Sequence, residues 1–156
     1  MADVVEITIQ ASGAGWADYV LVLGSQTFSM DGVSYCSDAL GDLLRAALQL
    51  AAGGREANCA FDREPYEWRL NLQVDVDPER LFLRVLEFPD FQKQSPTETG
   101  EVCFRGECGT RDFTLAVERA AVALLNEKGD AGYRDWWNMP FPSAALRALQ
   151  AAHAGD

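Results

Sequence analysis

Residues 38–52 read Asp-Ala-Leu-Gly-Asp-Leu-Leu-Arg-Ala-Ala-Leu-Gln-Leu-Ala-Ala, and this stretch divides the chain into two groups of strands. Its apolar residues recur three and four positions apart, which places them on one face of an amphipathic helix. Ser37 is a suitable N-cap for this helix, and Gly53-Gly54 is a suitable stop. The stretch therefore predicts one helix between two runs of strands.

Alternating apolar and polar residues on both sides of this helix indicate strands. The alternation is cleanest over residues 66–74, where we expect one face in the core and the other face in water. Residues 81–88 are apolar on both faces, which predicts a central strand that is covered on both sides. The predicted strands are residues 4–10, 19–23, 26–30, 56–62, 66–74, 81–88 and 101–107.

Two more helices are predicted in the last third of the sequence. Residues 112–128 carry an apolar stripe that stops at Gly129, and Pro142 suits the first turn of a short helix that ends near residue 152. The aromatic segment 133–141 between them is expected to be irregular. The order β-β-β-α-β-β-β-β-α-α predicts a single α+β domain, residues 1–156, with an antiparallel meander sheet and helices packed on one face.

The acidic residues are distributed unevenly. The 156 residues have a net charge of −11, and residues 1–44 hold six acids without any Lys or Arg. Nucleic acid and anionic membranes are poor partners for such a chain, because binding to phosphates depends on Lys and Arg. No apolar run approaches the ~18 residues that a membrane span needs. The first residues carry acids where a secretory signal has bases, so we expect a cytoplasmic protein.

Cofactor and nucleophile motifs are not found in the sequence. It contains no Gly-x-Gly-x-x-Gly, Walker or His-Glu-x-x-His motif, so neither a cofactor nor a metal is predicted. The four cysteines lack Cys-x-x-Cys spacing and are expected to be ordinary thiols. His153 is the one histidine, in an Ala-rich stretch, and we expect it to be solvated. Hydrolytic Ser-His and Cys-His mechanisms are therefore disfavoured.

Paired carboxylates are the remaining route to acid–base chemistry. Asp62, Glu64 and Glu67 flank the turn at residues 63–65, where two of them on adjacent strands would raise one pKa. The alternative interpretation is a solvated hairpin end. If these carboxylates perform acid–base chemistry, Glu64 and Glu67 would line a pocket between the helices and the sheet, near Trp136.

Aromatic and acidic residues also suggest a surface for a protein partner. The segment 133–141 contains Trp136 and Trp137, which either attach the last helix to the sheet or form a contact surface. Trp16 lies in a small-residue loop and is a second candidate anchor. The predicted partner-binding residues are Trp16, Asp18, Asp31, Asp38, Asp42, Trp136 and Trp137.

The chain resembles a set of small bacterial proteins of unassigned function in three segments, residues 34–47, 61–70 and 83–88. The resemblance covers about residues 33–90, extends to the Phe-Pro segment at 141–150, and implies no catalytic residues. In size, acidity and order of elements the chain is also similar to the immunity proteins of bacterial toxin systems.

Three hypotheses follow. The leading one is a non-catalytic acidic domain, of immunity type, that binds a basic partner protein. The alternative is a small-molecule binding protein or a carboxylate-dependent enzyme. The third is a homodimer formed through the edge strand at residues 4–10 or through the Trp136-Trp137 surface.

Overall fold

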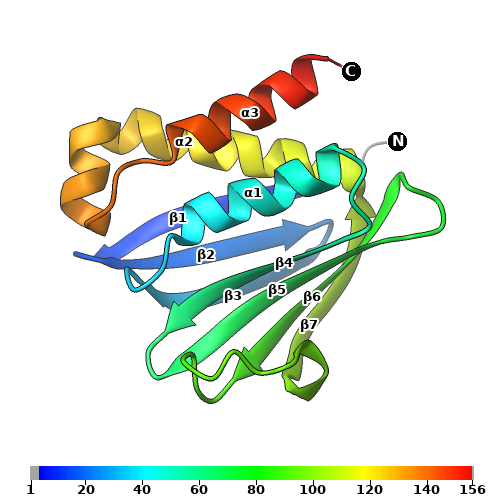
Figure 1. Cartoon of the computed structure of the whole chain (residues 1–156), viewed down its shortest axis with the longest axis horizontal. Coiled ribbons are helices and arrows are strands. Elements are labelled where there is room, and N and C mark those ends of the chain that lie inside the picture. The colour runs from blue at the N-terminus through cyan, green and yellow to red at the C-terminus, as the bar shows by residue number, and fades with distance from the viewer. Residues whose placement is uncertain (1–3, 156) are drawn as a thin grey trace.

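The computed structural model describes residues 4–155, which form seven strands and three α-helices. Their order along the chain confirms the predicted α+β class and the predicted sequence of elements (Figure 1). The strands are β1 (Val5–Gly13), β2 (Trp16–Leu23), β3 (Gln26–Ser34), β4 (Glu56–Arg63), β5 (Tyr66–Val74), β6 (Arg80–Phe88) and β7 (Glu101–Gly109). The helices are α1 (Ala39–Ala51), α2 (Thr110–Trp137) and α3 (Ser143–Ala154), and a short 3₁₀ turn spans Thr97–Thr99.

The strands form two antiparallel sheets. β1, β2 and β3 pair in that order, and β4 to β7 form a second meander in chain order. β3 and β4 lie against each other without forming a hydrogen-bonded ladder. The sequence predicted one meander sheet, but the structure has two. The division falls at α1, which connects β3 of the first sheet to β4 of the second.

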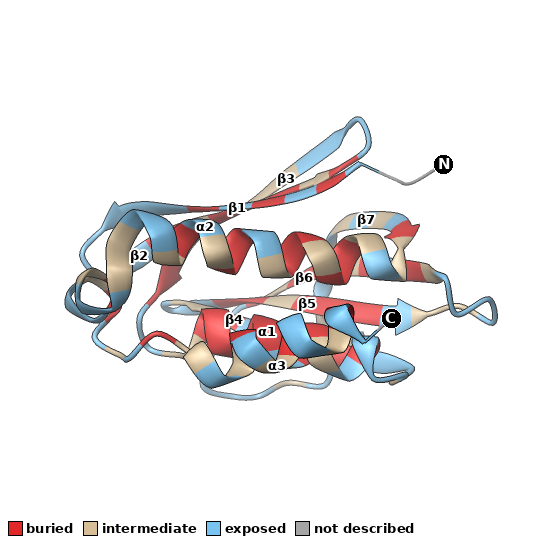
Figure 2. Ribbon diagram, turned by 90° about the horizontal axis from the view of Figure 1, so that it is seen from above, coloured by how far each residue is buried: buried red, intermediate tan, exposed pale blue. Residues whose placement is uncertain are grey.

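All three helices lie on one side of the strands (Figure 1). α2 runs over β1, whereas α1 packs on β4 and is flanked by α3 (Figure 2). The buried stripe of α1 is the predicted apolar face, and complete burial of a leucine stabilises a fold by about 1.5–3 kcal/mol. The largest members of this stripe are Leu40, Leu43, Leu44 and Leu50.

The N-cap of α1 is Asp38 rather than the predicted Ser37. The Asp38 carboxylate accepts a hydrogen bond from the Gly41 backbone N–H at 3.2 Å. Its negative charge also suits the positive end of the helix dipole, which a serine hydroxyl does not match. The Ser37 backbone carbonyl instead accepts a hydrogen bond from Trp137 Nε1 at 3.0 Å.

The last part of α2 differs from the prediction. Its first segment stops at Gly129, as predicted, because φ of 68° and ψ of 172° interrupt the helix there. A second helical segment then continues to Trp137, so the prediction that residues from 133 onward are irregular is wrong for this part. Tyr133 and Trp137 are both 1% exposed, and their burial explains why these residues become ordered in a helix.

The polar face of β5 is less exposed than its alternation predicts. Glu67 is 2% and Asn71 is 1% exposed. The segment 89–100 lies over the end of the sheet, where the Ser95 carbonyl accepts a hydrogen bond from Arg69 Nη1 at 2.6 Å. The expectation of a fully wetted face was therefore wrong, because a loop distant in sequence covers part of it.

β6 is covered on both faces only at its end. Leu86 and Phe88 are buried, as predicted for a central strand, whereas Phe82 is 42% exposed. The outer face of β6 is thus buried near Phe88, where the segment 89–100 begins, and exposed near Phe82.

Candidate functional site

Three chain segments, residues 13–16, 34–38 and 63–66, come together at the end of the molecule where α1 begins (Figure 1). The Tyr35 backbone N–H donates to the Gly15 carbonyl at 2.9 Å. The Cys36 thiol donates a hydrogen bond to the Glu64 carboxylate. These contacts join turns that are far apart in the sequence into one continuous surface.

This surface exposes three large aromatic side chains. Trp16 is 38%, Tyr35 is 45% and Tyr66 is 43% exposed, and Phe82 is the one other exposed aromatic residue within residues 4–155. Large aromatic side chains are enriched at the centres of protein interfaces. We call the group of Trp16, Asp18, Asp31, Tyr35, Glu64 and Tyr66 the aromatic–acidic surface.

Asp18 and Asp31 lie where β2 and β3 meet. Asp31 is exposed and accepts a hydrogen bond from the Ser29 hydroxyl. Asp18 is half-buried, and its carboxylate accepts the Gly32 N–H at 3.0 Å beside the irregular pairing of β2 with β3. Gly32 has a φ of 71°, a conformation that favours glycine. Asp18 therefore stabilises the irregular pairing of β2 with β3 in addition to adding negative charge.

Asp38 and Asp42 carry a counterion of their own. Arg45 Nη2 lies 3.0 Å from Asp38 Oδ2 and 2.8 Å from Asp42 Oδ1. These exposed ion pairs contribute little to stability, but they offset much of the negative charge at the start of α1. Of the four predicted aspartates, Asp31 is thus the most available to a partner.

The two tryptophans of the aromatic segment have different environments. Trp137 is 1% exposed, so its side chain contributes neither to an exposed contact surface nor to the proposed Trp136-Trp137 dimer face. Trp136 is half-buried and its Nε1 donates to the Gly13 carbonyl at 2.9 Å. A weaker contact of 3.3 Å joins the same nitrogen to the Trp16 carbonyl, so Trp136 supports the hairpin that carries Trp16.

Glu64 and Glu67 have separate partners. Glu67 Oε2 is 2.7 Å from Arg69 Nε, and both side chains are largely buried. Glu64 is exposed and accepts a hydrogen bond from the Cys36 thiol, which raises the pKa of that thiol. The carboxylate opposite Glu67 in the β4–β5 ladder is Asp62.

The pKa of Asp62 is raised by partial burial and, to a smaller extent, by the negative charges of Glu67 and Glu64. The strand register brings Asp62 opposite Glu67, so the negative charge of Glu67 acts on the Asp62 carboxyl, whereas acid–base chemistry at these residues stays a prediction. Sequence reasoning named the three carboxylates but could not choose between the pairs.

Asp62→Asn is expected to stabilise the fold at pH 7 by about 0.5 kcal/mol after solvent screening. A raised folded pKa means that ionised Asp62 destabilises the fold, and this cost grows as pH rises through the folded pKa. Below the ordinary value of 3.8 both states are protonated and the difference disappears. Urea denaturation at pH 7 and pH 3 measures this effect, with Asp130→Asn on the surface of α2 as control. A gain that persists at pH 3 contradicts the expectation.

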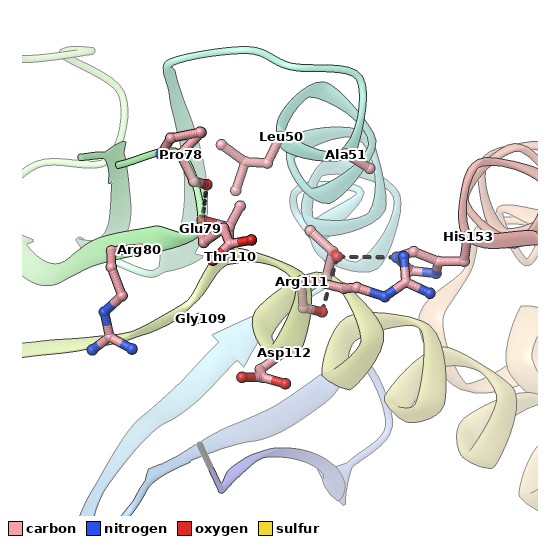
Figure 3. Close-up of a pocket in the computed structure, with 11 residues that line it drawn as sticks. Leu50, Ala51, Pro78, Glu79, Arg80, Gly109, Thr110, Arg111, Asp112 and His153 are labelled. Carbon is pink, nitrogen blue, oxygen red and sulfur yellow. Dashed lines mark hydrogen bonds between the residues drawn. The ribbon is translucent and has the colours of Figure 1, made fainter. Parts of the chain in front are cut away.

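A cavity of about 470 Å³ lies at the end of α1, whereas the aromatic–acidic surface lies at its start (Figure 3). It is formed by the end of α1, the β5–β6 turn, the start of α2 and His153 of α3. Neither Glu64, Glu67 nor Trp136 lines it, so this cavity is not the pocket that the acid–base hypothesis placed beside those residues.

His153 is buried, and the expectation that it is solvated is wrong. Its Nδ1 lies 2.6 Å from Glu118 Oε1, and its Nε2 lies 3.0 Å from Thr114 Oγ1. The Thr114 hydroxyl donates to the Arg111 carbonyl at 3.1 Å, as a threonine inside a helix commonly does. These bonds attach α3 to α2. The spacing of Leu146, Leu149 and His153 places them on one helical face, which was the signal for burial.

Metal-ligating clusters and membrane-spanning helices are both absent from residues 4–155. These residues contain no group of three or more His, Cys, Asp or Glu side chains that could hold a metal ion. None of the helices in this part of the chain is long and apolar enough to cross a membrane. What the fold and the surface define is an α+β protein with two antiparallel sheets and an exposed aromatic–acidic end.

Comparison with known proteins does not assign a family. No protein-family model and no curated protein matches the chain. Among solved structures, it is similar to a chain of the "CdiA-CT/CdiI toxin and immunity complex from Enterobacter cloacae". The TM-score is 0.48 at 11% identity, over 75% of this chain and 100% of the other. This likeness is too distant to carry an argument about fold or function.

Proposed function

We propose that this chain is a non-catalytic protein-binding domain that recognises a basic partner through the aromatic–acidic surface. The observation that carries the proposal is the meeting of three exposed aromatic rings, Trp16, Tyr35 and Tyr66, at one end of the fold. Amphipathic rings of this kind supply large contact areas that lose water on binding.

The charge of the surface favours a basic partner. Asp31 and Glu64, two acidic members of this surface, are exposed. The nearby Arg63 guanidinium is paired with Glu87 at 2.9 Å and is stacked over the Trp68 ring, 4.9 Å from its centroid. Complementary charge accelerates encounter and excludes acidic partners, and salt weakens it. An immunity-type role is the specific form we propose, since size, acidity and element order are similar to those of toxin-system immunity proteins.

Paired variants with equal charge test this proposal. Asp31→Lys/Glu64→Lys reverses the surface, and Glu127→Lys/Asp130→Lys makes the same change in net charge on α2, where both acids are exposed. Each protein is used to purify bound partners from the native host, and the recovered partner is then titrated by calorimetry.

We expect the wild type and the α2 variant to bind one partner of high pI, and the surface variant to bind it at least about tenfold more weakly. Trp16→Ser is expected to weaken binding as well, because it removes an anchor without changing charge. Equal binding by all variants would show that this end of the fold is not the interface.

A further inference from the structure

The outer face of the second sheet carries two arginines directly opposite each other on neighbouring strands. Arg84 of β6 is the register partner of Arg105 of β7. Both line a hollow of about 290 Å³ on this face. Like charges that face each other across an antiparallel pair destabilise a sheet. The placement of these two arginines is therefore not explained by folding stability.

Several other arginines of this fold have carboxylate partners. Four such arginines form ion pairs with acidic side chains, namely Arg45, Arg63, Arg69 and Arg80. Within residues 4–155, by contrast, the Arg84 side chain bonds only to the neutral Asn71 side chain, and the Arg105 side chain makes no hydrogen bond or ion pair. In a chain with a net charge of −11, two neighbouring guanidinium groups thus remain without a counterion.

Arg84 is held in one orientation by a buried amide. The Asn71 Oδ1 atom accepts from Arg84 Nε at 3.2 Å and from Arg84 Nη2 at 2.9 Å. Asn71 is itself fixed, because its Nδ2 donates to Asn58 Oδ1 at 2.8 Å and to Glu56 Oε2 at 3.0 Å. These bonds leave Nη1 of Arg84 as a donor. A guanidinium that is already oriented loses less entropy when it binds an oxyanion.

The remaining lining of the hollow contains no carboxylate. Its side chains include Gln73 and Phe82, and Phe82 is 42% exposed. An exposed aromatic ring beside two guanidinium groups offers apolar contact next to anion recognition. The acids nearest in the ladder are occupied, since Glu56 accepts from Asn71 and Gln73, and Glu107 is paired with Arg80.

We propose that this hollow binds an oxyanion, a carboxylate or phosphate group, between Arg84 and Arg105, with Phe82 contacting the apolar part of the molecule that carries it. The site is built on the outer face of β5, β6 and β7, whereas the aromatic–acidic surface lies at the turns beside α1. A protein partner and an oxyanion ligand therefore use different residues, and either proposal can fail without the other.

Nuclear magnetic resonance of the full chain tests the site with defined probes. The arginine Nε–H signals and the Asn71 side-chain amide are followed while inorganic phosphate, acetate or phenylacetate is added at constant ionic strength. We expect saturable shifts of Arg84, Arg105 and Asn71, with a Kd of about 1 mM or tighter for the best probe. Tighter binding of phosphate or of phenylacetate identifies the preferred oxyanion, and phenylacetate binding more tightly than acetate supports the role of Phe82.

Two variants separate this site from general charge effects. Arg105→Met is expected to weaken binding at least about tenfold, whereas Arg147→Met on the exposed side of α3 leaves it unchanged. Arg105→Met should also raise the melting temperature of the free protein, because it removes the repulsion from Arg84. The proposal is overturned by the absence of saturable shifts, by equal weakening in both variants, or by a lower melting temperature in Arg105→Met.

Discussion

Trp137→Ala is expected to lower the free energy of unfolding by about 3–5 kcal/mol, the cost of removing a buried large aromatic side chain. Trp137 is 1% exposed, and its ring centroid lies 4.9 Å from that of Trp136. Its Nε1 also donates to the Ser37 carbonyl at 3.0 Å, which joins the end of α2 to the start of α1. Urea or guanidinium denaturation followed by circular dichroism measures the loss.

Trp16→Ala is the matched control for this change. It deletes the same side chain from an exposed position, so we expect a loss within about 1 kcal/mol. Trp137→Phe keeps most of the ring volume but leaves the Ser37 carbonyl without its donor, which is expected to cost about 1–3 kcal/mol. A stable Trp137→Ala protein that has lost partner binding would instead make Trp137 a contact residue.

Local periodicity was sufficient to predict the elements that carry the fold. The α1 helix and the β5 strand were placed within a residue or two, because burial of one face leaves a repeat in the sequence. Two sheets could not be distinguished from one, since whether β3 and β4 pair depends on contacts that no local pattern records. The same holds for Asn71, whose polar side chain gave no sign that it would be buried.

The candidate surface was predicted in part. Trp16 is exposed, as an anchor requires, and it lies two residues before Asp18 in β2. Tyr66 was missed because it begins an alternating segment, where a local pattern does not show whether the ring is exposed. Tyr35 was missed because it follows β3 in a short connection to α1 that has no periodicity. Asp38 and Asp42 have a counterion that the charge count did not show, since Arg45 follows them at helical spacing and lies within ion-pairing distance of both.

Glu67→Ala is expected to lower the free energy of unfolding by about 3–5 kcal/mol, because it leaves a buried arginine without its counterion. Glu67 and Arg69 have side-chain exposures of 3% and 11%, and their Oε2 and Nε atoms are 2.7 Å apart. Arg69 also stacks on Phe88, 4.0 Å from the ring centroid, and bonds to the Ser95 carbonyl at 2.6 Å. Loss of the carboxylate therefore destabilises the contact between the sheet and the segment 89–100.

Glu87→Ala provides a control that differs mainly in burial. Glu87 lies on the adjacent strand and pairs with Arg63 at 2.9 Å, but the two side chains are 30% and 34% exposed. Exposed pairs are worth about 0–1 kcal/mol, so a much smaller loss is expected. Denaturation of both variants at the same pH and salt concentration compares them directly. Equal losses would mean that burial does not set the strength of these pairs, and a negligible loss in Glu67→Ala would return Glu67 to the set of candidate acid–base groups.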